Sequence, residues 1–173
     1  PVNRRSPGAS SKVSRIVPAL RDLRRYLGLG MKSAGLGTII GALPGTGGDI
    51  AAPLAYDQAR RTTPNPEVRF GKGAKEGLVA PEAANNAAVG GAFIPMLTLG
   101  IPGDAVTAVI IGALFIHGLK PGPLLLTETP HLFWFTVGNL ALANVFLLIF
   151  GLTGIRIFTK IVECPKAILI PLI

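Results

Sequence analysis

The stretch SAGLGTIIGALPGTGGDIAAPLAY, residues 33–56, decides how this chain folds. It is apolar and exceeds the ~20 residues that a helix needs to span a bilayer. A proline and four glycines interrupt it between residues 41 and 48, however. Irregular backbone at membrane depth survives only where protein or a water-filled cavity covers it. The stretch therefore predicts an all-α integral membrane protein, with transmembrane helices and with helices that are broken or re-entrant at Pro-Gly motifs.

A second break of the same kind follows at LGIPGD, residues 99–104. In both breaks a Pro-Gly pair precedes an aspartate, Asp49 or Asp104, and a helix-compatible run comes next. Asp is a preferred N-cap, and a helix start presents backbone N–H groups that bind anions. Paired broken helices that meet near the membrane midplane hold substrate and coupling ions in secondary transporters. We therefore expect the two breaks to face each other across a cavity.

The composition agrees with a membrane protein. Of the 173 residues, 49% are hydrophobic and only 15% are charged, and the mean hydropathy is +0.52. The net charge of +8 gathers in residues 1–32, which hold eight basic side chains and one acid. Lys and Arg collect on the cytoplasmic flanks of membrane segments, which explains this asymmetry more simply than nucleic-acid binding, for which no motif is present.

The chain is predicted to have three parts. Residues 1–14 have the composition of a flexible basic linker. Residues 15–32 contain an amphipathic helix that we expect on the cytoplasmic membrane surface, the alternative being an ordinary surface helix. Residues 33–173 form the membrane domain. Because the chain starts at Pro1 without a methionine and stops inside an apolar run, we expect a fragment of a longer protein.

Loop charges predict the topology of the membrane domain. Residues 57–76 hold five basic groups and three acids, so both flanks of residues 33–56 indicate the cytoplasm and predict a re-entrant hairpin. Residues 77–119 exceed the ~20 residues of one span and either cross once or double back. They carry small residues at a spacing that lets helices approach closely, in the lines Ala83-Ala87-Gly91 and Ala84-Ala88-Ala92. Residues 132–155 hold no charge and predict one conventional transmembrane helix.

Motifs of several other protein classes are missing. The single Cys164 excludes an internal disulfide, and the sequence shows no cluster of metal ligands. No Gly-Lys precedes Ser or Thr as in a P-loop, and Ile50 stands where a G-x-G-x-x-G motif needs its last glycine. A membrane-embedded enzyme or a structural membrane subunit is the alternative class, but His117 has no obvious nucleophile partner. We therefore expect no enzymatic activity, cofactor or metal.

The candidate site combines groups from both breaks with two adjacent amides. Backbone N–H groups at residues 45–48 and 103–105 are expected to hold substrate carboxylates. The predicted substrate-binding residues are Gly45, Thr46, Gly47, Gly48, Asn85, Asn86, Gly103, Asp104 and Thr107. The candidates for a coupling cation are Asp49, Asp104, Asn85 and Asn86. Simple helix capping is the alternative role of both aspartates, and helix packing is that of the asparagines and Thr107.

Five motifs follow one another in a fixed order. They are GALPGTGG (41–48), FGKG (70–73), PEAANNA (81–87), LGIPG (99–103) and HGLKPGP (117–123). As an ordered series they resemble the large permease subunit of tripartite tricarboxylate transporters, from Val17 to the end of the chain.

The resemblance implies a longer permease of which this chain is the second half, in an inverted-repeat transporter. It also implies a multi-pass protein of the bacterial cell inner membrane, with a small membrane subunit and a periplasmic solute-binding protein as partners. Such a permease imports citrate or related carboxylates, driven by a gradient of Na⁺ or H⁺. Family members often carry a small polar residue at position 104, which leaves Thr107 and backbone N–H groups as alternatives to Asp104.

Overall fold

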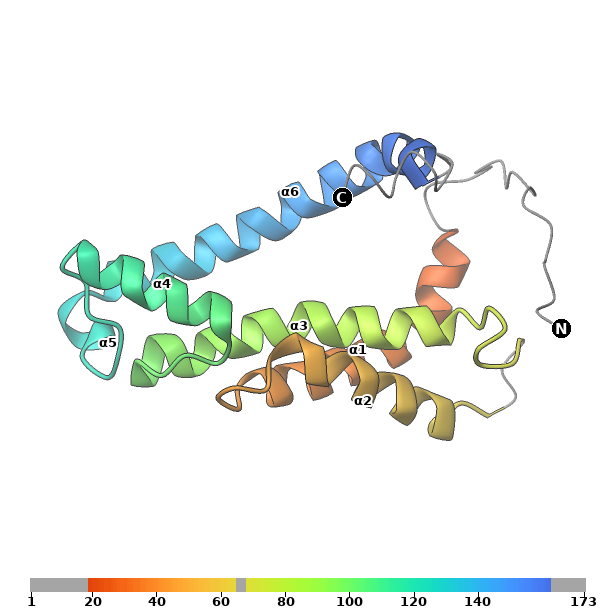
Figure 1. The fold of residues 1–173 in the computed structure, drawn as a ribbon, viewed down its shortest axis with the longest axis horizontal. Helices are drawn as coiled ribbons and strands as arrows, with labels where there is room; N and C mark the ends of the chain where they lie inside the picture. The colour runs from red at the N-terminus through yellow and green to blue at the C-terminus, as the bar shows by residue number, and fades with distance from the viewer. Residues whose placement is uncertain (1–18, 65–67, 163–173) are drawn as a thin grey trace, which may run out of the picture. The chain divides into compact units, whose positions relative to one another are not determined.

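The computed structural model describes residues 19–64 and 68–162, and the predicted linker, residues 1–14, lies outside them. All regular structure in the described ranges is α-helical, which confirms the predicted all-α class (Figure 1). Residues 20–140 form one compact unit, and α6 continues from residue 141 into a second. The helices are α1 (Leu20–Gly41), α2 (Gly47–Thr62), α3 (Glu76–Leu99), α4 (Ala105–Ile116), α5 (Leu125–Glu128) and α6 (Pro130–Val162).

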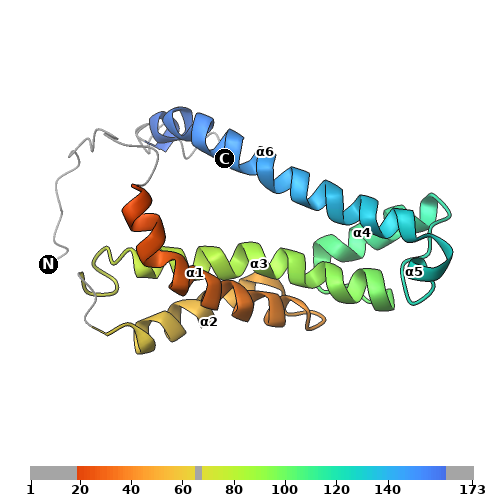
Figure 2. The ribbon, with the colours of Figure 1, turned by 180° about the vertical axis from the view of Figure 1, so that it is seen from behind.

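Three helices of the first unit, α1, α2 and α3, lie side by side (Figures 1 and 2). The chain reverses at the first Pro-Gly break, so α2 packs back along α1, as a hairpin requires. The location of this hairpin in a membrane stays a prediction. The buried faces consist of small residues four apart: Ser33, Gly37 and Gly41 on α1; Ala51, Ala55 and Ala59 on α2; Ala80, Ala84, Ala88 and Ala92 on α3.

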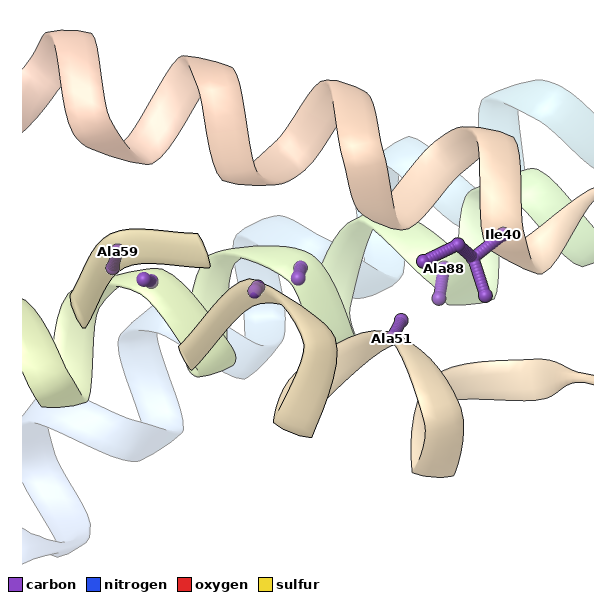
Figure 3. Close-up of a cluster of buried hydrophobic side chains, with 7 residues drawn as sticks. Ile40, Ala51, Ala59 and Ala88 are labelled. Carbon is purple, nitrogen blue, oxygen red and sulfur yellow. The ribbon is translucent and has the colours of Figure 1, made fainter. Parts of the chain in front are cut away.

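The glycines of α1 bring its backbone into contact with α3. A Cβ atom added to Gly37 would overlap the backbone of Ala84, and one added to Gly41 would overlap the backbone of Ala88. Figure 3 shows Ile40 close to Ala88, with Ala51 of α2 nearby. Such short side chains bury little apolar area each, so the stabilisation comes from van der Waals contact between closely spaced backbones.

The small residues of α3 differ in their burial. Ala84, Ala88 and Ala92 are fully buried, and one member of the other predicted line, Gly91, is also buried. The other two members, Ala83 and Ala87, are only partly buried. The line that faces the neighbouring helices is therefore the one through Ala84, Ala88 and Ala92, and it begins one turn earlier, at Ala80.

The first helix continues past the predicted boundary between the surface helix and the membrane domain. A single helix runs from Leu20 to Gly41, across residue 32, where the amphipathic helix was expected to give way to the membrane domain. The reason is packing: Leu29 and Leu36 pack against the same buried cluster on either side of that position. The predicted surface helix and the first arm of the hairpin are therefore one element.

The second break sends the chain back along α3. Gly100 ends α3 in the left-handed conformation, with φ of 71°, and its N–H donates to the Met96 carbonyl at 3.1 Å. The following residues return far enough for Gly103 to contact Ala92, and α4 then begins. Residues 100–103 therefore turn back beside α3 before α4 begins. Whether residues 77–119 cross a membrane once or double back in it stays a prediction.

Within the described residues, one helix has the length and composition to cross a membrane. This segment is Pro130–Ile155, 26 residues long, with none of its most apolar part buried. It coincides with the predicted transmembrane helix at residues 132–155. Ala105–Ile116 is also apolar but shorter.

Candidate substrate site at the two Pro-Gly breaks

The two Pro-Gly breaks lie against each other. The backbone N–H of Gly45 donates a hydrogen bond to the carbonyl oxygen of Gly103 at 2.8 Å. Gly47, with φ of 57°, lies beside Asp104, since a Cβ atom on Gly47 would be 3.4 Å from the Asp104 Cβ. The sequence predicted that the breaks would face each other across a cavity. In the structure the two breaks are in direct contact through this hydrogen bond.

Gly103 occupies the tightest position at this junction. A Cβ atom there would lie 2.7 Å from both the Cα and the Cβ of Ala92, and 2.9 Å from the carbonyl oxygen of Gly41. A larger residue would therefore push the second break away from α1 and α3. Gly103 therefore lets the two breaks come together, and its role in substrate binding stays a prediction.

Thr46 stabilises the end of α1 and leaves the start of α2 without a side-chain cap. Its hydroxyl lies within hydrogen-bonding distance of two carbonyl oxygens, that of Ile40 and that of Leu43, the latter at 2.7 Å. Thr46 is the N-cap of α2 by position, but its side chain makes no cap hydrogen bond. The first N–H groups of a helix have no acceptor within the helix, so those of α2 remain available to a ligand.

Some of the predicted backbone donors already have acceptors. The N–H of Gly45 bonds to Gly103, that of Thr46 to the Leu43 carbonyl at 3.3 Å, and that of Asp104 to the Thr107 hydroxyl at 2.9 Å. The donors that remain in the first turn of α2 belong to Gly47, Gly48 and Asp49. The anion-binding capacity of the first break is therefore concentrated at the start of α2.

The two asparagines of α3 lie in different surroundings. The Asn85 amide lies against Gly48, because a Cβ atom on Gly48 would overlap the Asn85 Oδ1. The Asn86 Nδ2 donates to the carbonyl of Glu82, one turn earlier on the same helix, at 2.9 Å. Successive helical residues point about 100° apart. The structure thus places Asn85 at the start of α2 and gives Asn86 a bond within α3.

Asp104 and Thr107 form a reciprocal capping box at the start of α4. The Asp104 Oδ1 accepts from the Thr107 N–H and from the Thr107 hydroxyl, both at 2.7 Å, while the Asp104 N–H donates to the Thr107 Oγ1. Thr107 is only 1% exposed. The capping alternative therefore describes the geometry of Asp104, and Thr107, for which helix packing was the alternative, is the partner residue of this cap.

The Asp104→Ala variant tests this capping role. We expect the free energy of unfolding to fall by about 0.5–2 kcal/mol, because α4 loses its N-cap acceptor. Asp104→Ser should keep most of the stability, since a serine hydroxyl caps in the same way. Thermal unfolding in detergent, followed by circular dichroism, measures both. Equal stability of the alanine variant and the parent would contradict a stabilising cap.

Asp49 is not an N-cap, contrary to the capping alternative drawn from the sequence. The helix begins earlier, at Gly47, so Asp49 lies in its first turn and is exposed. Gly47, the first residue of this helix, has a left-handed backbone that glycine adopts without steric cost. Among the described residues, the Asp49 carboxylate has no ion pair or hydrogen bond, so its oxygens remain available beside the α2 start.

Sequence reasoning missed three contributors to this junction. The contacts of Ala92 and of the Gly41 carbonyl with Gly103, and the bonds of Thr46 to the end of α1, arise only when the chain has folded. The available signal was the small-residue line through Ala92, which indicates close approach but does not name the approaching segment.

The sequence of this chain matches a known protein family and two relatives. A family model described as the tripartite tricarboxylate transporter TctA family matches residues 2–173. An uncharacterised 52.8 kDa protein from the TAR-I ttuC′ 3′ region of Agrobacterium vitis is 40% identical over 152 residues, which cover 88% of this chain and 30% of that protein. An uncharacterised protein from the TAR-II ttuC′ 3′ region of the same organism is 41% identical over 137 residues, which cover 79% and 56%.

The chain thus spans less than two thirds of the length of either relative. No solved structure matches. The family match covers nearly the whole chain, and the matched residues include both breaks whose contact is described above. The chain therefore belongs to the tripartite tricarboxylate transporter TctA family, a family of membrane transporters.

Proposed function

We propose that this chain is part of a multi-pass permease that imports tricarboxylates or related carboxylates across the bacterial inner membrane. A gradient of Na⁺ or H⁺ drives the import, and a small membrane subunit and a periplasmic solute-binding protein act with the permease. Membership of the family supports the transport of carboxylates and the need for partner subunits. The observation that carries the location of the site is the contact between the two breaks beside the uncapped start of α2.

A substrate carboxylate would bind at the start of α2. The N–H groups of Gly47, Gly48 and Asp49 have no acceptor within the helix, and the helix dipole favours an anion there. Residues 33–59 and 76–119, which contain both breaks, include no Lys or Arg. The carboxylate would therefore be held by backbone and amide dipoles, without a basic side chain from these segments. Binding without a full countercharge is weaker, and it lets a transporter release its substrate again.

A coupling cation would bind at the same helix end. The Asp49 carboxylate and the Asn85 Oδ1 offer oxygen ligands next to the first turn of α2. Asp49 would otherwise repel a bound carboxylate, so a cation between them makes substrate binding depend on the ion. Asp104 and Asn86 are weaker candidates, because the capping box and the Glu82 carbonyl already engage their polar atoms.

Uptake into proteoliposomes tests the proposal. The full-length permease is reconstituted with its small subunit, and labelled citrate is supplied with the solute-binding protein under an imposed Na⁺ or pH gradient. We expect uptake only when both the gradient and the binding protein are present. If correctly folded permease takes up neither citrate nor other carboxylates under either gradient, the proposal of transport is contradicted and a structural role in the membrane is favoured.

Asn85→Leu and Asn86→Leu form a matched pair for the site. We expect Asn85→Leu to reduce uptake about tenfold, because it removes an amide from the start of α2, whereas Asn86→Leu loses one hydrogen bond on α3. Initial uptake rates at equal protein amounts measure the difference. Equal effects of the two variants would contradict the placement of the site at Asn85.

Single cysteines at Thr63 and Thr127 test the predicted topology. Thr63 follows α2 in the loop predicted to be cytoplasmic. Thr127 lies in residues 120–131, a proline-rich segment whose single Lys and single Glu predict an external loop. We expect a membrane-impermeant maleimide to label them from opposite sides of intact vesicles, in a background with Cys164 replaced by serine. Labelling of both from the same side would contradict the assignment based on loop charges.

A further inference from the structure

The segment between α4 and α5, residues 117–124, returns from the end of α4 to the end of α3 (Figures 1 and 2). It contains the motif HGLKPGP. Gly118, directly after α4, has a left-handed backbone with φ of 73° and is exposed. Pro121 and Gly122 are buried. The second part of the motif is therefore packed against the rest of the protein, although it lies outside any helix.

Gly122 caps the end of α3. Its N–H donates a hydrogen bond to the carbonyl oxygen of Leu97 at 3.3 Å. The carbonyl groups in the last turn of a helix have no N–H partner within that helix, and the N–H of Ile101 donates to Pro95 instead. Both neighbours of Gly122 are prolines, which have no N–H. Gly122 is therefore the one residue of this Pro-Gly-Pro sequence that can donate to α3.

The same segment contacts Gly100, where α3 ends and the second break begins. A Cβ atom on Gly100 would lie 2.7 Å from the Pro121 carbonyl oxygen. The left-handed backbone of Gly100 sets the direction in which residues 101–103 leave the helix. Gly103 then accepts the hydrogen bond from Gly45 of the first break. The segment thus contacts the residue that directs the second break toward the first.

Leu125, the first residue of α5, anchors the segment. It is only 2% exposed and belongs to a buried cluster with Met96 and Leu97 of α3 and Ile111 of α4. This cluster ties the helix before the second break to the helix after it. The adjacent Leu124 is 62% exposed. Leu125 therefore holds both helices that flank the break.

We propose that residues 121–125 are a positioning element of the transport site. They hold the second break in the orientation in which the Gly103 carbonyl accepts from Gly45, and they act through α3 without contributing a substrate ligand. Loosening of this contact would also move Asp104 away from Gly47 at the start of α2, where a carboxylate would bind. The importance of this element for transport rests on the proposed function, whereas its effect on the contact between the breaks does not.

Gly122→Ala, with Gly118→Ala as its matched control, tests the proposal. Both glycines have a positive φ, of 143° and 73°, which alanine rarely adopts. Gly122 bonds to α3, whereas no atom lies within 4 Å of the Cβ position at Gly118. Amide hydrogen exchange of the full-length permease in detergent, at single-residue resolution, measures protection of the Gly45 N–H. We expect exchange about tenfold faster in Gly122→Ala and unchanged in Gly118→Ala.

Uptake kinetics in proteoliposomes give the second readout. For Gly122→Ala we expect the apparent KM for citrate to rise about tenfold, while the maximal rate per folded permease changes less, because the segment positions the site and does not hold the substrate. Gly118→Ala should keep the KM of the parent. A purely structural role would instead lower the amount of folded permease and leave the KM unchanged.

Leu125→Ala and Leu124→Ala decide the question if Gly122→Ala does not fold. Leu125→Ala removes the buried anchor and should speed exchange at Gly45, whereas Leu124→Ala should not. Exchange like that of the parent in folded Gly122→Ala or Leu125→Ala would overturn the positioning role. An absence of carboxylate uptake by the parent permease would contradict the proposed function, and the exchange rates would still decide the positioning role.

Discussion

Gly37→Ala is expected to destabilise the protein strongly, although it adds a single methyl group. The new Cβ would overlap the carbonyl group of Ala84, so α1 and α3 must move apart. Backbone cannot yield as the end of a flexible side chain does, and overpacking of a tight interface costs about 1–3 kcal/mol or more. The separation would also loosen the neighbouring contact of Gly41 with Ala88. The apparent Tm in detergent, measured by circular dichroism, should fall accordingly.

Gly35→Ala is the matched control for this experiment. Gly35 lies on the same helix, two residues away, and nothing lies within 4 Å of the position of its Cβ. Alanine is the better helix former by about 1 kcal/mol, so this variant should be as stable as the parent or more stable. A Gly37→Ala protein with the Tm of Gly35→Ala would show that the backbones of α1 and α3 are not in contact.

Gly48→Ala is expected to reduce carboxylate uptake about tenfold or more while leaving the fold intact. The added Cβ would overlap the Asn85 Oδ1, which lies at the end of a flexible side chain and can turn away. Loss of one hydrogen bond to a charged group costs about 1.5–3 kcal/mol, which corresponds to at least about tenfold in affinity. Initial uptake rates in proteoliposomes measure the effect, with Gly90→Ala on α3 as an open-glycine control.

A double variant separates displacement of the amide from general damage. If Gly48→Ala acts by moving Asn85, the Gly48→Ala/Asn85→Ala protein should be no less active than Asn85→Ala alone, because the two changes share one mechanism. Independent, additive losses would instead show that Gly48 contributes in another way, for example through the approach of the substrate to its N–H group. Normal uptake by Gly48→Ala would remove the start of α2 from the site.

The contact between the two breaks was only partly predictable. Pro-Gly pairs in apolar segments predict interruptions of a helix, and both interruptions occur where the sequence predicted them. Sequence reasoning did not show that Gly45 donates to Gly103, because a backbone hydrogen bond between segments far apart in the chain depends on the path of the chain and not on residue type. Likewise, adjacent amides at positions 85 and 86 read alike in the sequence, but helix geometry turns only Asn85 toward Gly48.

The sequence by itself determined the helical class, the position of the apolar helix at residues 132–155, the locations of the two breaks and the family. These properties depend on local composition, spacing and the order of motifs, which can be read without coordinates. Tertiary structure alone decided that α1 runs uninterrupted from Leu20 to Gly41, that Thr46 bonds to the end of α1 and leaves α2 uncapped, and that Asp104 caps α4 while Asp49 does not cap α2. The physical reason is that a helix end or a polar side chain takes its role from whichever neighbour packing brings within hydrogen-bonding distance.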